Sequence, residues 1–272
     1  MLGQTLLTLG YLSARRAGRI TLLSPYFPLG RSDRDEGDLE LALPPFITHI
    51  LNSAASNQLN RIISFDLHAP QVVMAGGIMG MITEVTLAKK VLTHVIQDVF
   101  GQGIKKVVIH FSDDGARKRY EDLVHEVSLE LQIPLPITCG TKRRKSGAES
   151  KHGILYGDVD DLGESLVIAL DDEAATMSTL IHTAEAIRSD YPILGFYSAV
   201  IHGVFCDPAV ELLERDDCPI TRTYASDTIP FHNRPHLQTL ISNGKLVVIP
   251  SAKDLANIIF FHHWSENIRN IR

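Results

Sequence analysis

Two adjacent carboxylates followed by a hydroxyl-rich stretch are the residues of this sequence best suited to chemistry. Asp171 and Asp172 come directly after the apolar run Leu166–Leu170, and residues 175–179 include three hydroxyl side chains. A short aliphatic run bounded by polar residues is typical of a buried strand, and the next stretch, 180–188, has the pattern of a helix. N–H groups at a helix start are unpaired and carry partial positive charge, so they attract phosphate. Because carboxylates accept hydrogen bonds from sugar hydroxyls, the pattern indicates a candidate sugar-phosphate site.

An ordinary helix cap produces the same local pattern. In that alternative, Thr176 or Ser178 only satisfies a backbone donor at the start of a crossover helix. The local sequence fits both interpretations, so residues elsewhere in the chain must decide between them.

Charged side chains follow three other predicted strands in the same way: Arg31 after 19–24, Asp66 and His68 after 61–65, and Asp113 after 106–111. Ligands of open parallel sheets bind beyond the carboxyl ends of the strands, so we expect these side chains to converge on one crevice. The alternatives are capped strand ends, a helix start at Asp113 and solvated charge runs at 117–119 and 142–145. These alternatives do not explain why the charges fall at strand ends.

The elements that must position these residues alternate between strands and helices. The predicted strands cover 19–24, 61–65, 106–111, 166–170, 196–201 and 246–249, and helical spacing extends over 86–100 and 119–131. Alternation of this kind predicts parallel sheets with right-handed crossovers. We therefore expect two α/β units that meet near residue 86.

Composition narrows the class of protein. The 272 residues are 44% hydrophobic and 21% charged, with a formal net charge of −6, which favours a soluble globular protein and argues against a nucleic-acid partner. No apolar run reaches the roughly 20 residues of a membrane span. The spacing of Cys139, Cys206 and Cys218 suggests neither a disulfide framework nor a zinc site, which favours a reducing cytoplasm.

In their order, these motifs resemble the ribose-phosphate pyrophosphokinase family. The similar segments span nearly the whole chain and are 19–34, 66–71, 112–115, 142–144, 157–159, 171–179, 202–205 and 227–230. The resemblance implies two phosphoribosyltransferase-like α/β domains with parallel sheets. By the same resemblance, we expect the first, residues 1–86, to be truncated and to lack the family's leading strands. The second covers 87–272, with its final helix packing back on the first.

The resemblance also implies an activity and its residues. The family transfers pyrophosphate from ATP to ribose 5-phosphate, with Mg²⁺ on the phosphates, and typically forms homo-oligomers. Carried over by motif, ATP would be bound by Arg31, Ser32 and His68, the metal by His68 and Asp113, and catalysis would fall to Lys142 and Arg144 on a flexible loop. Ribose 5-phosphate would be bound by Arg144, Asp171, Asp172, Ala175, Thr176, Met177, Ser178 and Thr179.

The sequence departs from the family pattern at three of these positions. Ala175 stands where the family has an acid, Ser178 where it has glycine, and Ser32 where it usually has glutamine. Two other functions therefore stay open: a non-catalytic synthetase paralogue that acts as an interaction or regulatory subunit, and a phosphoribosyltransferase.

Overall fold

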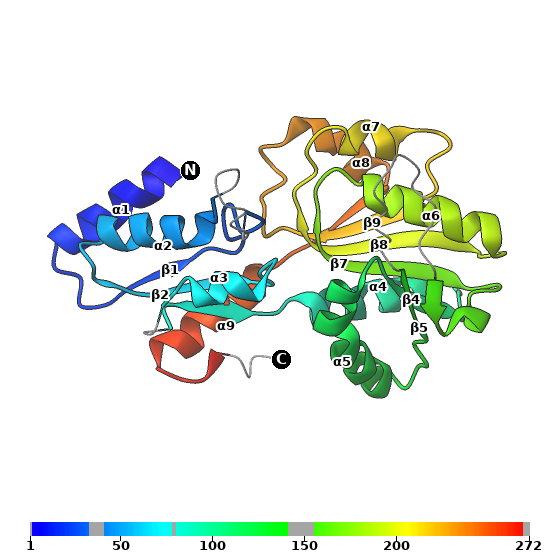
Figure 1. Cartoon of the computed structure of the whole chain (residues 1–272), viewed down its shortest axis with the longest axis horizontal. Helices are drawn as coiled ribbons and strands as arrows, with labels where there is room; N and C mark the ends of the chain where they lie inside the picture. The colour runs from blue at the N-terminus through cyan, green and yellow to red at the C-terminus, as the bar shows by residue number, and fades with distance from the viewer. Residues whose placement is uncertain (1, 33–40, 78–79, 141–154, 269–272) are drawn as a thin grey trace. The chain divides into compact units, whose positions relative to one another are not determined.

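The chain passes twice between two structural units (Figure 1). The computed structural model describes residues 2–32, 41–77, 80–140 and 155–268. Unit 1 comprises Met1–Thr86 and Ile258–Arg272, and unit 2 comprises Leu87–Asn257. The last helix, α9 (Ala252–His263), therefore begins in unit 2 and ends in unit 1. None of the helices within the described ranges is long and apolar enough to cross a membrane.

Unit 1 is built on a parallel sheet with the strand order β1-β2-β3. Its strands are β1 (Ile20–Leu23), β2 (Leu59–Phe65) and β3 (Ile82–Val85), and its helices are α1 (Leu2–Ala14), α2 (Leu43–Ala54) and α3 (Pro70–Met74). Helices α1 and α2 pack on one side of this sheet, and the end of α9 lies on the other (Figure 1). Proline in the first turn suits the start of both α2 and α3, because the missing N–H has no partner there anyway.

Unit 2 contains a larger sheet with the strand order β10-β9-β8-β7-β4-β5-β6, in which only the edge strand β6 is antiparallel among the described strands. The strands are β4 (Val107–Phe111), β5 (Ile137–Gly140), β6 (Leu155–Gly157), β7 (Leu166–Ala174), β8 (Gly195–Gly203), β9 (Arg222–Ser226) and β10 (Leu246–Ile249). The helices are α4 (Ala88–Gly101), α5 (Asp114–Leu131), α6 (Ser178–Asp190), α7 (Ala209–Glu214) and α8 (Gln238–Ser242), with short 3-10 turns at Val159–Asp161 and Pro235–Leu237.

Helices cover both faces of this sheet. Helices α4 and α5 lie on one face and α6, α7 and α8 on the other (Figure 1). The central strands are consequently buried on both sides, which explains their continuous apolar runs. The carboxyl ends of the parallel strands β4, β7, β8, β9 and β10 all lie at one edge, where ligands of such sheets bind.

The predicted α/β fold class with parallel sheets is confirmed. Each predicted strand and helix has a counterpart, but the sequence pattern missed β3, β5, β6 and β9. Strand β9 illustrates why. It contains Thr223 and Ser226, which neighbouring strands bury, so its sequence has no apolar run that would predict a strand. Helix α5 begins five residues before the predicted start because Asp113 caps it.

Candidate functional site

The two carboxylates of the central motif lie inside a strand rather than after it. Strand β7 continues to Ala174, four residues beyond the predicted apolar run, and Asp171 pairs with Val200 of β8. Although successive side chains of a regular strand point to opposite faces, Asp172 lies close enough to Asp171 to hydrogen-bond with it and to act on its charge. Oδ1 of Asp171 accepts a hydrogen bond from the backbone N–H of Asp172 at 2.9 Å.

The two acids differ in their electrostatic environment. Asp172 is buried, and its Oδ2 lies 3.7 Å from Nη1 of Arg119 on α5, an ion pair that favours the charged carboxylate. Burial, followed by the charge and hydrogen bond of Asp172, raises the pKa of Asp171 well above its usual value, and the charge of Asp113 adds to the shift. Asp171 is therefore the member of the pair that tends to hold a proton when no ligand is present.

The 175–179 segment connects β7 to α6 without a side-chain cap. The N-cap residue of α6 is Met177, at φ +65° and ψ −9°, and it makes no side-chain cap hydrogen bond. The alternative in which Thr176 or Ser178 caps the helix is therefore not observed. Ser178 is the first helical residue, so the left-handed backbone falls at Met177, one position before the site where the family has glycine.

Asp113 caps the start of α5, which is the structural alternative that the sequence left open. Its Oδ1 accepts hydrogen bonds from the backbone N–H groups of Gly115 and Ala116, both at 3.0 Å, and so caps α5. An N-cap uses one carboxylate oxygen. A bound cation would have to use the other, Oδ2, or share the capping oxygen.

The basic residues 117–119 that follow Asp113 make different contacts. Arg117 pairs with Glu121 at 2.7 Å and lies over the Tyr156 ring, and only Arg119 reaches the acid pair on β7. Lys118 is exposed. The helical spacing of the run decides this division, because neighbouring residues on a helix point about 100° apart.

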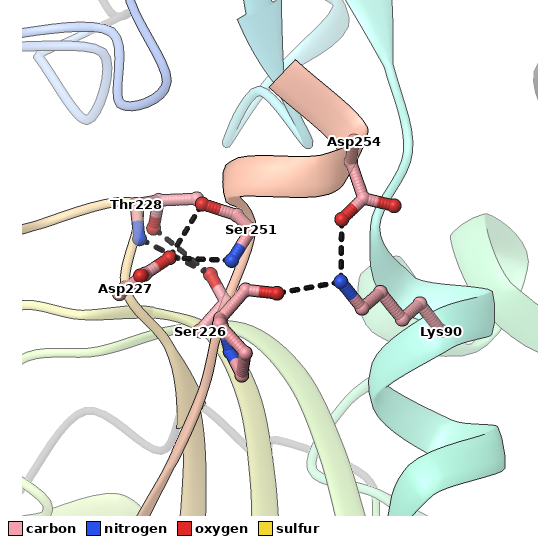
Figure 2. A network of polar contacts seen from close by, with 7 residues as sticks. Lys90, Ser226, Asp227, Thr228, Ser251 and Asp254 are labelled. Carbon is pink, nitrogen blue, oxygen red and sulfur yellow. Dashed lines mark hydrogen bonds and ion pairs between the residues drawn. The ribbon is translucent and has the colours of Figure 1, made fainter. Parts of the chain in front are cut away.

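A polar network joins the ends of β9 and β10 (Figure 2). Asp227 accepts hydrogen bonds from both the backbone N–H and the hydroxyl of Ser251, and the hydroxyls of Ser226 and Thr228 lie 3.1 Å apart. A ring nitrogen of the buried His202, Nδ1, lies 2.9 Å from Oγ1 of Thr228. These side chains lie at the ends of β8, β9 and β10, within or next to the segments 202–205 and 227–230 that carry the family resemblance.

The same network includes the start of the last helix. Lys90 of α4 donates to Asp254 on α9 and to the carbonyl oxygen of Pro250 (Figure 2). The chain crosses between the units at residues 86–87 and again at 257–258, close in sequence to Lys90 and to Asp254 respectively. The contact therefore ties the first turn of α4 to the first turn of α9.

In unit 1, the strand-end motif after β2 is partly structural. Asp66 is buried at φ +31°, and its Oδ1 accepts a hydrogen bond from Oγ1 of Thr86 at 2.7 Å. The backbone N–H of Leu67 donates to Oε1 of Glu84 at 2.8 Å. With the turn held in this way, the side chain of His68 is exposed beyond the sheet edge.

Arg31 and Ser32 follow β1 in a hydrogen-bonded turn. The backbone N–H of Ser32 donates to the carbonyl of Leu29 at 3.1 Å, and the carbonyl of Ser32 accepts from the N–H of Leu43 at 2.8 Å. Arg31 is exposed and Ser32 half-buried. Thus Arg31, Ser32 and His68 follow the ends of unit 1 strands, whereas Asp113, Asp171 and Asp172 belong to unit 2; convergence of all of them on one crevice stays a prediction.

Two predicted catalytic residues, Lys142 and Arg144, lie outside the described residues. Within the described ranges, no group of three or more His, Cys, Asp or Glu side chains is arranged to hold a metal ion.

Sequence reasoning missed a buried histidine beside this edge. His110 is the penultimate residue of β4, with Nδ1 3.0 Å from Oγ1 of Thr138. Its Nε2 and the hydroxyl of Ser112 are buried with no hydrogen-bond partner among the described residues. Burial lowers the pKa of His110 to about 4. The run Val107–Phe111 reads as apolar apart from this residue, so only the packing reveals its state.

The fold and these residues define a class: a two-unit α/β protein with sugar- and phosphate-binding residue types at the carboxyl ends of parallel strands. No family model matches the chain. Individual relatives do, and all three described here are ribose-phosphate pyrophosphokinases.

The relative from Deinococcus radiodurans is 27% identical over 255 residues, covering 94% of this chain and 73% of that protein. The one from Aquifex aeolicus is 26% identical over 249 residues, covering 92% and 71%. Ribose-phosphate pyrophosphokinase 2 of Schizosaccharomyces pombe is 25% identical over 252 residues, covering 93% and 71%.

A solved structure supports the fold. The crystal structure of phosphoribosylpyrophosphate synthetase from Mycobacterium smegmatis aligns with a TM-score of 0.75 at 24% identity, covering 97% of this chain and 78% of that one. The resemblance to the ribose-phosphate pyrophosphokinase family is therefore confirmed along nearly the whole chain.

Proposed function

We propose that the chain is a ribose-phosphate diphosphokinase, a transferase that converts ATP and ribose 5-phosphate into phosphoribosyl pyrophosphate and AMP. The observation that carries the proposal is the Asp171–Asp172 pair on β7, followed by an α6 start whose first-turn N–H groups receive no side-chain cap. In a chain similar to these enzymes over 94% of its length, a sugar-phosphate ligand is the best match for that arrangement.

The ribose 5-phosphate site would combine carboxylates with backbone donors. Asp171 and Asp172 would accept hydrogen bonds from the ribose hydroxyls. The N–H groups and hydroxyls of the 175–179 segment would surround the 5-phosphate, since a helix start supplies both donors and a favourable dipole. Ala175 contributes only its backbone to this segment, because its side chain has no polar atom.

The resemblance also implies residues for ATP and the metal. Arg31, Ser32 and His68 would bind the nucleotide, and His68 and Asp113 would hold Mg²⁺ through positions that the phosphates complete. When bound, Mg²⁺ neutralises charge on the phosphate oxygens. Because Asp113 already caps α5, its carboxylate is held in one orientation, which favours a fixed ligand position.

In the proposed reaction, the anomeric hydroxyl oxygen of ribose 5-phosphate attacks the β-phosphorus of ATP. The bond from that phosphorus to the oxygen bridging the α-phosphorus breaks, AMP leaves, and the hydroxyl proton passes to solvent. Phosphoryl-type transfer needs positioning and cationic groups more than covalent help from the protein. Lys142 and Arg144 would supply positive charge to the transition state, and Arg144 would also contact ribose 5-phosphate.

The wider assignments rest on the same resemblance. We propose that residues 1–86 and 87–272 are the two synthetase domains, with the final helix returning to the first. We also propose a homo-oligomer that works in the cytoplasm and binds neither nucleic acid nor membrane. The net charge of −6 supports the exclusion of nucleic acid.

The substitutions at Ala175 and Ser178 favour a second candidate function, a non-catalytic paralogue that binds an active synthetase as an interaction or regulatory subunit. Both lie in the segment that would grip the substrate phosphate. A phosphoribosyltransferase is a third candidate, because it would use the same segment with another leaving group.

The first prediction is that the purified full-length chain forms AMP from ATP only when ribose 5-phosphate and magnesium are both present. Lys142→Ala and Arg144→Ala are each expected to lower kcat about a hundredfold or more, the usual cost of losing a preorganised group that stabilises transition-state charge. Lys145→Ala, in the same basic run, is the matched control and is expected to keep kcat near that of the wild type.

Three results separate the candidate functions. A folded chain that forms no AMP contradicts the diphosphokinase. If that inactive chain co-purifies with an active relative and changes its turnover, it acts as the interaction or regulatory subunit. If instead it releases pyrophosphate from phosphoribosyl pyrophosphate with a nucleobase, it is a phosphoribosyltransferase.

A further inference from the structure

Arg234 makes an unusual set of contacts close to the proposed ribose 5-phosphate site. It lies in the loop between β9 and α8, and its guanidinium donates to three consecutive carbonyl oxygens, those of Gly203 (2.7 Å), Val204 and Phe205 (3.2 Å). The fork of five N–H donors of arginine suits such a cluster of acceptors. The three carbonyls belong to the segment where β8 ends, defined here as the 203–206 turn.

The 203–206 turn has a conformation that needs support. Phe205 is at φ +42°, in the left-handed region that is costly for a residue with a side chain. At Gly203, an added Cβ would lie 2.5 Å from the Phe205 ring and 2.9 Å from the Phe231 ring. Arg234 also lies over both rings, 6.0 Å and 5.6 Å from their centroids. One side chain therefore holds both the backbone and the rings of the turn.

The 203–206 turn is itself hydrogen-bonded to the proposed phosphate-binding segment. The N–H of Phe205 donates to the carbonyl of Ala174 at 2.9 Å, and the N–H of Cys206 donates to the carbonyl of Ala175 at 3.1 Å. Ala174 ends β7, and Ala175 opens the 175–179 segment. A continuous path of hydrogen bonds thus runs from Arg234 through the turn to the segment.

We propose that Arg234 is a positioning residue of the ribose 5-phosphate site, which it fixes through the 203–206 turn without touching the substrate. The inference rests on the proposed function, because it assigns the 175–179 segment to the substrate phosphate. With no acid at Ala175 and no side-chain cap at α6, the backbone of this segment depends on neighbours for its orientation. The turn supplies two of those neighbouring contacts.

The test compares Arg234→Met, which keeps the aliphatic stem but removes all donors, with Arg234→Lys, which keeps a charge that reaches fewer carbonyls. Arg234→Met is expected to raise KM for ribose 5-phosphate about tenfold, with kcat and KM for ATP changed less than about threefold. Arg234→Lys is expected to fall between wild type and Arg234→Met.

Arg188→Met is the matched control. Arg188 also donates to a backbone carbonyl, that of Pro219 at 3.3 Å, from the last turn of α6, away from the 175–179 segment. It is expected to leave KM for ribose 5-phosphate unchanged. Equal changes in both KM values and in kcat for Arg234→Met and Arg188→Met would overturn the inference in favour of general stabilisation.

Amide hydrogen exchange tests the inference independently of turnover. In Arg234→Met, the amides of residues 175–179 and of Phe205 and Cys206 are expected to exchange at least about tenfold faster than in wild type, while the strand interior of β4 stays protected. Unchanged exchange overturns the inference even if the wild type is active. Absence of AMP from the wild type defeats the proposed function instead. If Arg234→Met does not fold, Arg234→Lys carries both measurements.

Discussion

Asp171→Asn is expected to make the protein more stable at neutral pH while removing about a hundredfold of its kcat/KM for ribose 5-phosphate. The loss of activity follows from replacing a carboxyl oxygen that accepts from the ribose hydroxyls with an amide NH2 that cannot accept, since a polar group left without its partner costs about 1–3 kcal/mol. The gain in stability follows from the raised pKa of Asp171, which burial and Asp172 produce. A neutral amide of the same shape avoids an ionised carboxylate in that position.

The raised pKa of Asp171 makes the stability of the protein depend on pH. Because the folded protein holds the proton of Asp171 more tightly than the unfolded chain, this residue lowers stability as pH rises from its usual pKa of 3.8 to its raised value. Below that range it has no effect. Unfolding by denaturant at several pH values should therefore show the advantage of Asp171→Asn grow with pH and then level off.

Asp172→Asn is the contrasting variant. It removes the ion pair with Arg119 from a buried position, so it is expected to lose both activity and stability. Asp122→Asn, on the exposed side of α5, is the control and is expected to change neither. An Asp171→Asn protein that is less stable than the wild type at pH 7 contradicts the electrostatic assignment. Full activity in that variant contradicts the ribose assignment.

His110→Val is expected to reduce the loss of folding stability that the protein shows as pH falls. Burial lowers the pKa of His110 to about 4, from 6.5 in the unfolded chain. Between these two pKa values, His110 binds a proton in the unfolded chain but not in the folded protein. The folded protein therefore loses stability as pH falls from about 6.5 to about 4. The shift corresponds to about 3 kcal/mol at most. Valine suits a strand that is buried on both sides.

The measurement is the free energy of unfolding of both proteins between pH 7 and pH 4. Carboxylates also titrate in the lower part of this range, so the difference between the two curves carries the information. His182→Gln, at an exposed position on α6, should retain the wild-type curve. Parallel curves for wild type and His110→Val would show that His110 does not titrate with folding.

The main features of the fold could be predicted because they depend on local patterns. Strands buried on both faces, such as β4 and β7, appear as apolar runs, and amphipathic spacing marks α4 and α5. The strands that were missed either are short or carry polar residues whose burial depends on neighbouring strands. Thr223 and Ser226 of β9 are buried in this way.

For the candidate site, the sequence predicted residues, but it did not decide which of them make structural contacts instead. Asp66 and Asp113 were both recognised at strand ends, yet Asp66 binds Thr86 and Asp113 caps α5. Whether a carboxylate is available to a ligand depends on which donors lie within about 3 Å of it, and neighbours in space are only partly neighbours in sequence.

The order of apolar runs and polar motifs along the chain was sufficient to predict the α/β class and the family resemblance, and to single out Asp171 and Asp172 as candidate site residues. Apolar runs repeat over short stretches of sequence, and the order of motifs is a property of the linear chain. Only the tertiary structure decided that the acids lie within β7, that Arg119 pairs with one of them, and that Arg234 holds the turn beside them. The reason is physical: desolvation and hydrogen bonding act between groups that folding brings together, and the contacts of Arg119 and Arg234 join residues 29 or more positions apart in the sequence.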